Sequence, residues 1–148
     1  MAGAPLPEGV SEVYDAAGGL APFLARCDYV VSLLPSTAET RGLLDNGALA
    51  ACGKGTVLIN AGRGDVVSER SVLDALDAGH LRHAVLDVHA VEPLPLTSEL
   101  WDRADVTVTP HNSAESFPED VAEAFAENLK RWRAGEGLLH ELDWQRGY

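Results

Sequence analysis

The chain has 148 residues, of which 46% are hydrophobic, so it can form a globular domain with one hydrophobic core. It carries 11 basic and 23 acidic residues, a formal net charge of -12. This surplus of negative charge disfavours nucleic acid and anionic membranes as partners, because like charges repel. No stretch has the length and apolarity of a membrane-spanning helix, and the N-terminus lacks a signal-peptide pattern, so a cytoplasmic location is expected.

Short apolar runs rich in β-branched residues predict four strands, over residues 29–34, 56–60, 84–88 and 106–109. Their nearly continuous apolarity is typical of strands covered on both faces, as in a parallel sheet. Two helices are predicted between and after them, one capped by Ser68 and ended by Gly79, the other starting at a capping box of Ser116 and Glu119. Shorter helical pieces are expected over 19–26 and 46–51. The alternation predicts an α/β fold.

Chemically active side chains follow three of the predicted strands. Arg63 follows the second, Asp87 and Glu92 the third, and His111 the fourth. Because parallel strands present their carboxyl ends at one edge of the sheet, where ligands bind, we expect these groups to converge. Arg63 offers a planar fork of donors for a carboxylate, and His111 can exchange a proton near neutral pH. A neighbouring Glu92 would favour the imidazolium, and Asp87 could accept a hydrogen bond from a carboxamide such as that of nicotinamide.

Each of these residues, taken alone, has an ordinary alternative: a surface ion pair for the arginine and a structural role for the histidine. His80 and His83 have no third ligand at a suitable spacing, so no metal site is predicted. We interpret the glycines 62 and 64 as a sharp turn, because they form only half of a dinucleotide fingerprint. The apolar stripe that ends at Trp132 is expected in the core or at an interface.

In combination, these segments are recognisable. The strings LINAGRG (58–64), AVLDVHAVEPLP (84–95) and VTVTPHNSAES (106–116) together resemble the nucleotide-binding half of the D-isomer-specific 2-hydroxyacid dehydrogenases. The last six residues, 143–148, resemble the end of the glyoxylate/hydroxypyruvate reductase branch. The likeness runs from about residue 8 to the end, and its specificity comes from the ordered series of Arg63, Asp87, Glu92 and His111.

The resemblance implies a partial doubly wound parallel sheet, Rossmann-like, which lacks the first β-α-β unit with its glycine loop and the substrate domain. Residues 1–134 would form an incomplete NAD(P)-binding domain, and residues 135–148 a tail that packs on the substrate domain. It further implies that Arg63 binds and polarises a 2-oxo acid and that Glu92 orients the acid–base residue His111. The implied cofactor is NAD or NADP, with NADPH slightly favoured, and its implied contacts are Leu34, Pro35, Ala61, Gly62, Arg63, Asp87, His111 and Ala114.

Three classes of function remain open. The first is an oxidoreductase that transfers a hydride between a nicotinamide cofactor and a small 2-oxo acid such as glyoxylate or hydroxypyruvate. The second is a truncated, inactive remnant that acts at most as an oligomerisation or interaction module, as the missing glycine loop suggests. The third, a flavodoxin-like binding domain, explains the sheet but not the ordered series of polar residues. The resemblance also implies a homodimer, and a second copy could cover an exposed edge strand.

Overall fold

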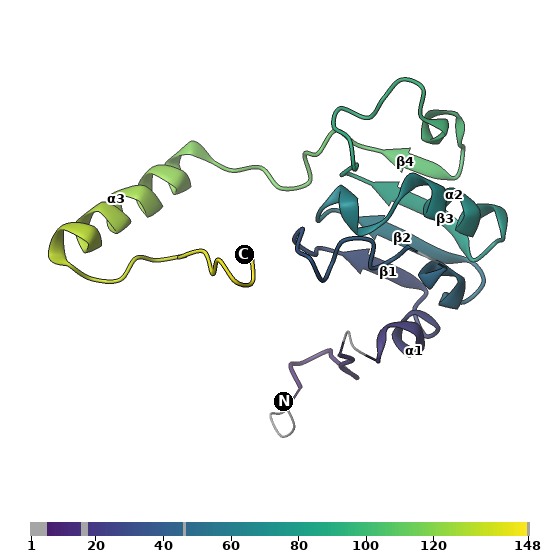
Figure 1. The fold of residues 1–148 in the computed structure, drawn as a ribbon, viewed down its shortest axis with the longest axis horizontal. Helices are drawn as coiled ribbons and strands as arrows, with labels where there is room; N and C mark the ends of the chain where they lie inside the picture. The colour runs from purple at the N-terminus through teal and green to yellow at the C-terminus, as the bar shows by residue number, and fades with distance from the viewer. Residues whose placement is uncertain (1–5, 16–17, 46, 148) are drawn as a thin grey trace.

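The computed structural model describes residues 6–15, 18–45 and 47–147. Short helices, parallel strands and one long helix follow each other along the chain, as Figure 1 shows. In chain order they are α1 (Leu20–Leu24), β1 (Tyr29–Ser32), η1 (Ala48–Ala51), β2 (Thr56–Asn60), η2 (Gly64–Val66), α2 (Glu69–Asp77), β3 (Leu81–Leu86), η3 (Glu99–Asp102), β4 (Val106–Val108) and α3 (Pro118–Ala134).

The strands form one four-stranded parallel sheet in the order β1-β2-β3-β4. Val31 lies opposite Ile59, Ile59 opposite Val85, and Val85 opposite Thr107. The predicted α/β fold with a parallel sheet is therefore confirmed, although β1 ends at Ser32, before the predicted end, and β3 begins earlier than predicted. All four carboxyl ends lie at the same edge of the sheet, which is the arrangement that places ligand sites in open α/β sheets.

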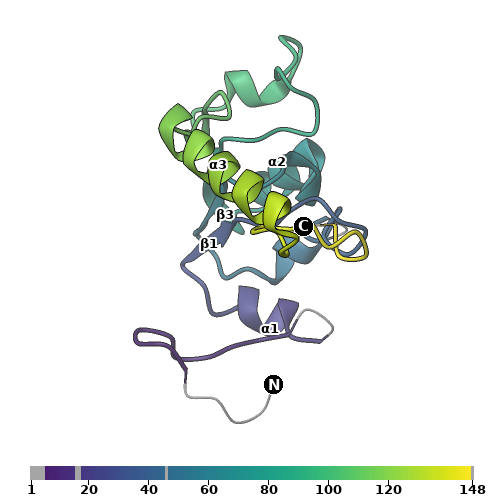
Figure 2. The same ribbon diagram turned by 90° about the vertical axis from the view of Figure 1, so that its left-hand side faces the viewer.

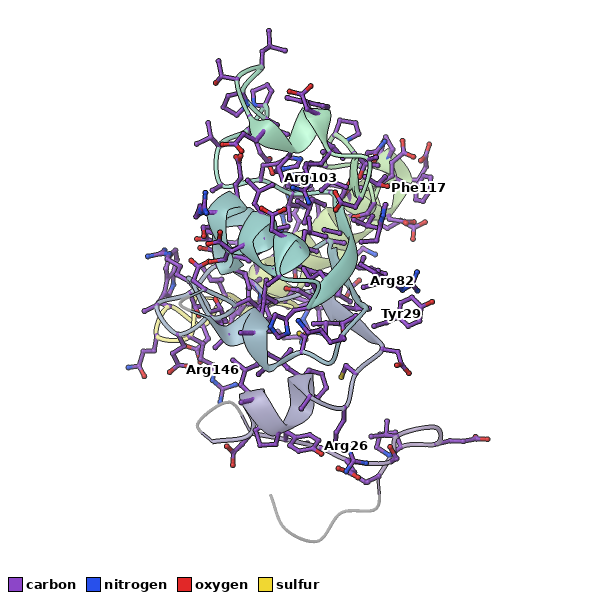
Figure 3. The ribbon with its side chains drawn as sticks, turned by 90° about the vertical axis from the view of Figure 1, so that its right-hand side faces the viewer. Arg26, Tyr29, Arg82, Arg103, Phe117 and Arg146 are labelled. Carbon is purple, nitrogen blue, oxygen red and sulfur yellow. The ribbon has the colours of Figure 1, made fainter. Side chains whose placement is uncertain are left out.

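One face of the sheet carries the core. Leu58 and Ala84 are fully buried there, and Val72 and Leu76 from α2 belong to the same cluster. Side chains alternate along a strand, so Tyr29 and Val31 of β1 face the other way, and they are 58% and 56% exposed. Figure 3 shows Tyr29 on the side of the sheet away from α2. The prediction of strands covered on both faces is thus confirmed for the central β2 but is wrong for the edge strand β1.

The two predicted helix starts have different outcomes. Ser68 caps α2 as predicted, its hydroxyl accepting the N–H of Ser71, and Gly79 follows the helix with a φ of 70°. The predicted capping box of Ser116 and Glu119 is wrong, because the N-cap is Phe117 and no side chain caps this end. Pro118 occupies the first helical position, where its fixed φ and missing N–H cost nothing, and this moves the start by one residue.

Helix α3 stands apart from the sheet, joined to it by the segment 109–117 (Figure 1). No described residue of this helix is buried, and Trp132 is 68% exposed. Of the two predicted positions for the stripe that ends at Trp132, the core is therefore wrong, and an interface stays a prediction. The tail folds back on the helix in the same region (Figure 2). Asn128 bonds the backbone of Leu139 in both directions, at 3.1 and 2.7 Å, and Arg131 donates to Gly137 O.

None of the helices in the described part of the chain has the length and apolarity needed to cross a membrane.

Replacement of Leu58, which is 0% exposed at the centre of the sheet, by Ala should lower the free energy of unfolding by about 3 kcal/mol, since it leaves a cavity in a packed layer. Urea unfolding followed by circular dichroism measures the change. Leu96→Ala is the matched control, because Leu96 is 94% exposed. Equal losses in the two variants would contradict this placement of the core.

Candidate active site

The carboxyl ends of the strands are joined to one another by backbone hydrogen bonds. Ala61 N–H, just after β2, donates to Ser32 O at 3.0 Å. Asp87 N–H, just after β3, donates to Asn60 O at 3.0 Å, and Thr109 N–H continues the pattern from β4 to β3. The loops that carry the predicted site residues therefore begin side by side, as parallel pairing requires.

Two buried glycines allow these loops to touch. A Cβ at Gly62 would lie 2.6 Å from Leu34 N, and a Cβ at Gly64 would overlap the backbone of His89 and Ala90. Both positions therefore need glycine for the close approach of another backbone. The interpretation of this segment as a tight turn agrees with these contacts, and the turn brings the residues around Arg63 against the loop that follows β3.

His111 and Glu92 form a hydrogen-bonded pair at this edge. His111 Nδ1 lies 2.8 Å from Glu92 Oε2, and His89 N–H donates to Glu92 Oε1 at 2.9 Å. The hydrogen bond from His111 and the one from His89 lower the pKa of Glu92 below its ordinary value. Because an ionised carboxylate can only accept, Nδ1 is the donor, and Nε2 of the imidazole is left for a ligand.

Asp87 is buried, with 4% of its surface exposed, and is bound to the segment that carries His111. Its carboxylate accepts the Thr109 hydroxyl, Asn112 N–H at 3.1 Å and Ser113 N–H at 2.9 Å. Burial alone would raise the pKa of Asp87, but the hydrogen bonds from Ser113, Thr109 and Asn112 outweigh it and hold this pKa far below its ordinary value. Sequence reasoning gave Thr109, Asn112 and Ser113 no role at the site; the only signal for Thr109 was its position as the last residue of a predicted strand.

Arg63 is exposed at the tip of the loop after β2. Its Nη1 donates to Gly62 O at 2.8 Å, and within the described ranges its guanidinium forms no salt bridge with a carboxylate. The ordinary alternative of a surface ion pair is therefore not what the structure shows. The guanidinium remains available for an external anion.

A cavity of about 420 Å³ opens beside the His111–Glu92 pair. Apart from this pair and His89, its wall is mainly apolar, with Leu94, Trp101, Val108 and Pro110 among its residues. A small polar ligand that reaches the imidazole there would lie beside apolar side chains.

The remaining predicted cofactor contacts surround the same edge. Leu34, Pro35 and Ala61 are half-buried, and Gly62 is buried against Leu34. Ala114 is exposed, directly after the residue whose N–H binds Asp87. Along the carboxyl edge of the sheet, the predicted contacts Leu34, Pro35 and Ala61 thus lie at the neighbouring ends of β1 and β2. The pair of Glu92 and His111 lies at the neighbouring ends of β3 and β4.

Comparison with known proteins decides the family. The model described as "D-isomer specific 2-hydroxyacid dehydrogenase, NAD binding domain" matches residues 6–113. The chain belongs to the D-isomer-specific 2-hydroxyacid dehydrogenase family. A crystal structure of a family member from Xanthobacter autotrophicus Py2 with NADPH and MES is 45% identical, with a TM-score of 0.85, over 88% of this chain and 54% of that chain.

Two further dehydrogenase structures extend over nearly the whole chain. An NADPH-dependent glyoxylate/hydroxypyruvate reductase from Sinorhizobium meliloti, in complex with NADP and sulfate, is 39% identical with a TM-score of 0.90, over 99% of this chain and 47% of that one. A probable 2-hydroxyacid dehydrogenase from Rhizobium etli, with NADP, HEPES and tartaric acid, is 38% identical with a TM-score of 0.86, over 97% and 46%. This chain therefore spans about half the length of these dehydrogenases.

Gly64→Ala should destabilise this dehydrogenase chain by about 1–3 kcal/mol, because the added methyl would overlap the backbone of His89 and Ala90. Thermal or urea unfolding measures the loss. Gly137→Ala is the matched control, since a Cβ there would meet nothing within 4 Å. If both variants unfold alike, the backbone contact between the two loops is not present in solution.

Proposed function

We propose that this chain carries the nicotinamide side of an active site that transfers a hydride between NAD(P) and C2 of a small 2-oxo or 2-hydroxy acid. The observation that carries this proposal is the 2.8 Å pair of His111 and Glu92, one loop away from an arginine with no carboxylate partner in the described chain. Glyoxylate and hydroxypyruvate are the proposed substrates, because the relative from Sinorhizobium meliloti is a reductase of these acids.

In this proposal the residues divide the work of reducing a 2-oxo acid. The guanidinium of Arg63 binds the substrate carboxylate and draws electron density from the neighbouring carbonyl oxygen. His111, as imidazolium, donates its Nε2 proton to that oxygen as the oxygen gains negative charge. Glu92 fixes the ring through Nδ1 and stabilises its charged form. The reverse reaction uses the same groups, with the neutral imidazole accepting the hydroxyl proton.

The residues at the edge fit a nicotinamide cofactor. Half-buried apolar surfaces of Leu34, Pro35 and Ala61 lie at the ends of adjacent parallel strands, where dinucleotides bind in such sheets. We propose NADP in preference to NAD, since three of the related structures contain NADP or NADPH. When bound, the reduced cofactor supplies the hydride, and Gly62, Arg63 and Ala114 complete the proposed contacts.

We also propose a division of the chain at Gly135. Residues 1–134 would form the NAD(P)-binding part, and residues 135–148 a tail that packs on a substrate domain. The exposed apolar residues of the tail, among them Leu142 and Trp144, support this arrangement because they need a partner surface.

The variant His111→Ala should lose about 10²–10⁴-fold in kcat for NADPH-dependent reduction of glyoxylate or hydroxypyruvate, because the proton donor is removed. NADPH oxidation at 340 nm measures the rate. His83→Ala is the control, since His83 bonds Thr107 on the outer sheet face, away from the pair. An unmodified protein without turnover on any small 2-oxo acid would contradict the proposed reaction and favour the interaction-module alternative.

A homodimer is the further proposal for this chain. Tyr29, Val31 and Leu33 form an exposed apolar row on the edge strand and its extension, a surface that a second copy could cover. Val31→Lys should then shift the protein to monomer in sedimentation velocity, whereas Leu96→Lys should leave its state unchanged. Sedimentation of the unmodified protein as a monomer at high concentration would contradict the dimer.

A further inference from the structure

We propose that Asn60 is a positioning residue for Arg63: its buried carboxamide fixes the turn over residues 61–63 and thereby sets where the guanidinium lies. The catalytic part of this inference rests on the proposed function, whereas the structural part rests on hydrogen bonds within the chain. It gives a task to a side chain that the proposed reaction does not otherwise use.

Asn60 is a polar residue on the buried face of the sheet. It is the last residue of β2, is 1% exposed, and lies on the same face of the strand as the fully buried Leu58. A polar group in such a place costs free energy unless it is hydrogen-bonded. The amide of Asn60 therefore needs partners for both its oxygen and its nitrogen, and it has them.

Both ends of this amide bind the turn that carries Arg63. Asn60 Oδ1 accepts Gly62 N–H at 3.3 Å, and Asn60 Nδ2 donates to Arg63 O at 3.1 Å. A backbone N–H can only donate and a backbone carbonyl can only accept, so the turn requires one acceptor and one donor at the end of a short side chain. An ionised aspartate offers two acceptors, and an apolar residue offers neither.

The guanidinium of Arg63 is held by the peptide group that lies between these two bonds. Its Nη1 donates to Gly62 O at 2.8 Å, so the guanidinium lies against the turn. Asn60 binds the peptide group before this carbonyl, through Gly62 N–H, and the peptide group after it, through Arg63 O. A rotation of the central peptide would move Gly62 O, and the guanidinium with it. The amide of Asn60 opposes that rotation from both sides.

The far side of the turn has supports of its own, so the contribution of this amide can be separated from them. Gly42 N–H donates to Asp65 O at 2.8 Å, and Leu44 N–H donates to Val66 O at 3.0 Å. These bonds tie η2, the next element, to the loop that follows β1. Loss of the amide should therefore loosen the turn over residues 61–63 and leave η2 in place.

The kinetic test uses Asn60→Asp, which keeps the size of the side chain and removes its N–H donors. This variant should lower kcat/KM for glyoxylate by up to roughly a hundredfold, as expected when a group that binds the substrate shifts by about 1 Å. In an Arg63→Ala background the same change should lower kcat/KM by less than about twofold, because a residue that acts only through Arg63 has nothing left to position. Losses that add in the double variant would overturn the proposal.

Thr56→Val is the matched control for the loss of a buried polar group. Thr56 lies at the opposite end of β2, is 2% exposed, and its hydroxyl donates to Cys27 O at 2.9 Å. Its replacement should lower the free energy of unfolding and leave kcat/KM for glyoxylate unchanged. An equal fall of kcat/KM in both variants would mean that both act through general stability, which overturns the positioning role.

Amide hydrogen exchange in the unmodified chain keeps the proposal testable if Asn60→Asp fails to fold. Gly62 N–H lies beyond the end of β2, yet its bond to Asn60 should make it exchange as slowly as the amides within β2. Gly137 N–H, in an exposed residue of the tail, should exchange fast. Equally fast exchange at Gly62 overturns the proposal whatever the turnover. Slow exchange at Gly62 in a protein that reduces no 2-oxo acid supports the structural part and sinks the proposed function alone.

Discussion

Close backbone contact at the carboxyl edge of the sheet is the constraint on which the site depends. Gly62 packs against the backbone of Leu34, and Gly64 against that of His89, so three successive loops meet without side chains between them. Arg63 lies between these glycines and is therefore placed by the same contacts. His89 in turn presents its N–H to Glu92, which holds His111. A path of direct contacts thus connects the arginine to the imidazole.

The long helix depends on a different kind of stabilisation. Helices of this length are only marginally stable in water by propensity alone, and most gain their stability from packing an apolar face. In this chain the tail supplies part of that packing, because Asn128 and Arg131 bond the backbone over 137–139. Phe125 and Trp132 still remain 68% exposed. The helix and tail therefore form a unit that has more apolar surface than it can cover itself, which supports a further packing partner.

Sequence reasoning recovered the features that depend on local patterns. Apolar runs located the four strands, and Ser68 and Gly79 marked the limits of α2. It failed where two local signals compete for the same position. It also failed where a side chain binds backbone groups that lie far away in the sequence. Pro118 displaced the capping box at Ser116, because a proline suits the first helical position better than the second or third.

The role of Asp87 illustrates the second limit of sequence reasoning. Two of its partners are backbone N–H groups, which every residue but proline possesses. The residue types near position 112 therefore cannot predict these hydrogen bonds. A strand-end carboxylate looks the same in the sequence whether it faces a ligand or a turn. Only the fold shows the turn that this carboxylate binds.

Both carboxylates of the site are stabilised in their ionised form by donors within the chain. Hydrogen bonds to the ionised form lower both pKa values below their ordinary ones. Glu92 accepts them from His111 and His89, and Asp87 accepts them from the segment 109–113. Each carboxylate therefore stabilises the fold at any pH above its pKa in the unfolded chain. This stabilisation is lost only as the pH falls through the lower pKa that the group has in the folded chain. Both carboxylates therefore stay ionised and hydrogen-bonded in mildly acidic solution. Arg63, without a carboxylate partner in the described chain, supplies the positive charge that would attract the carboxylate of the proposed substrate.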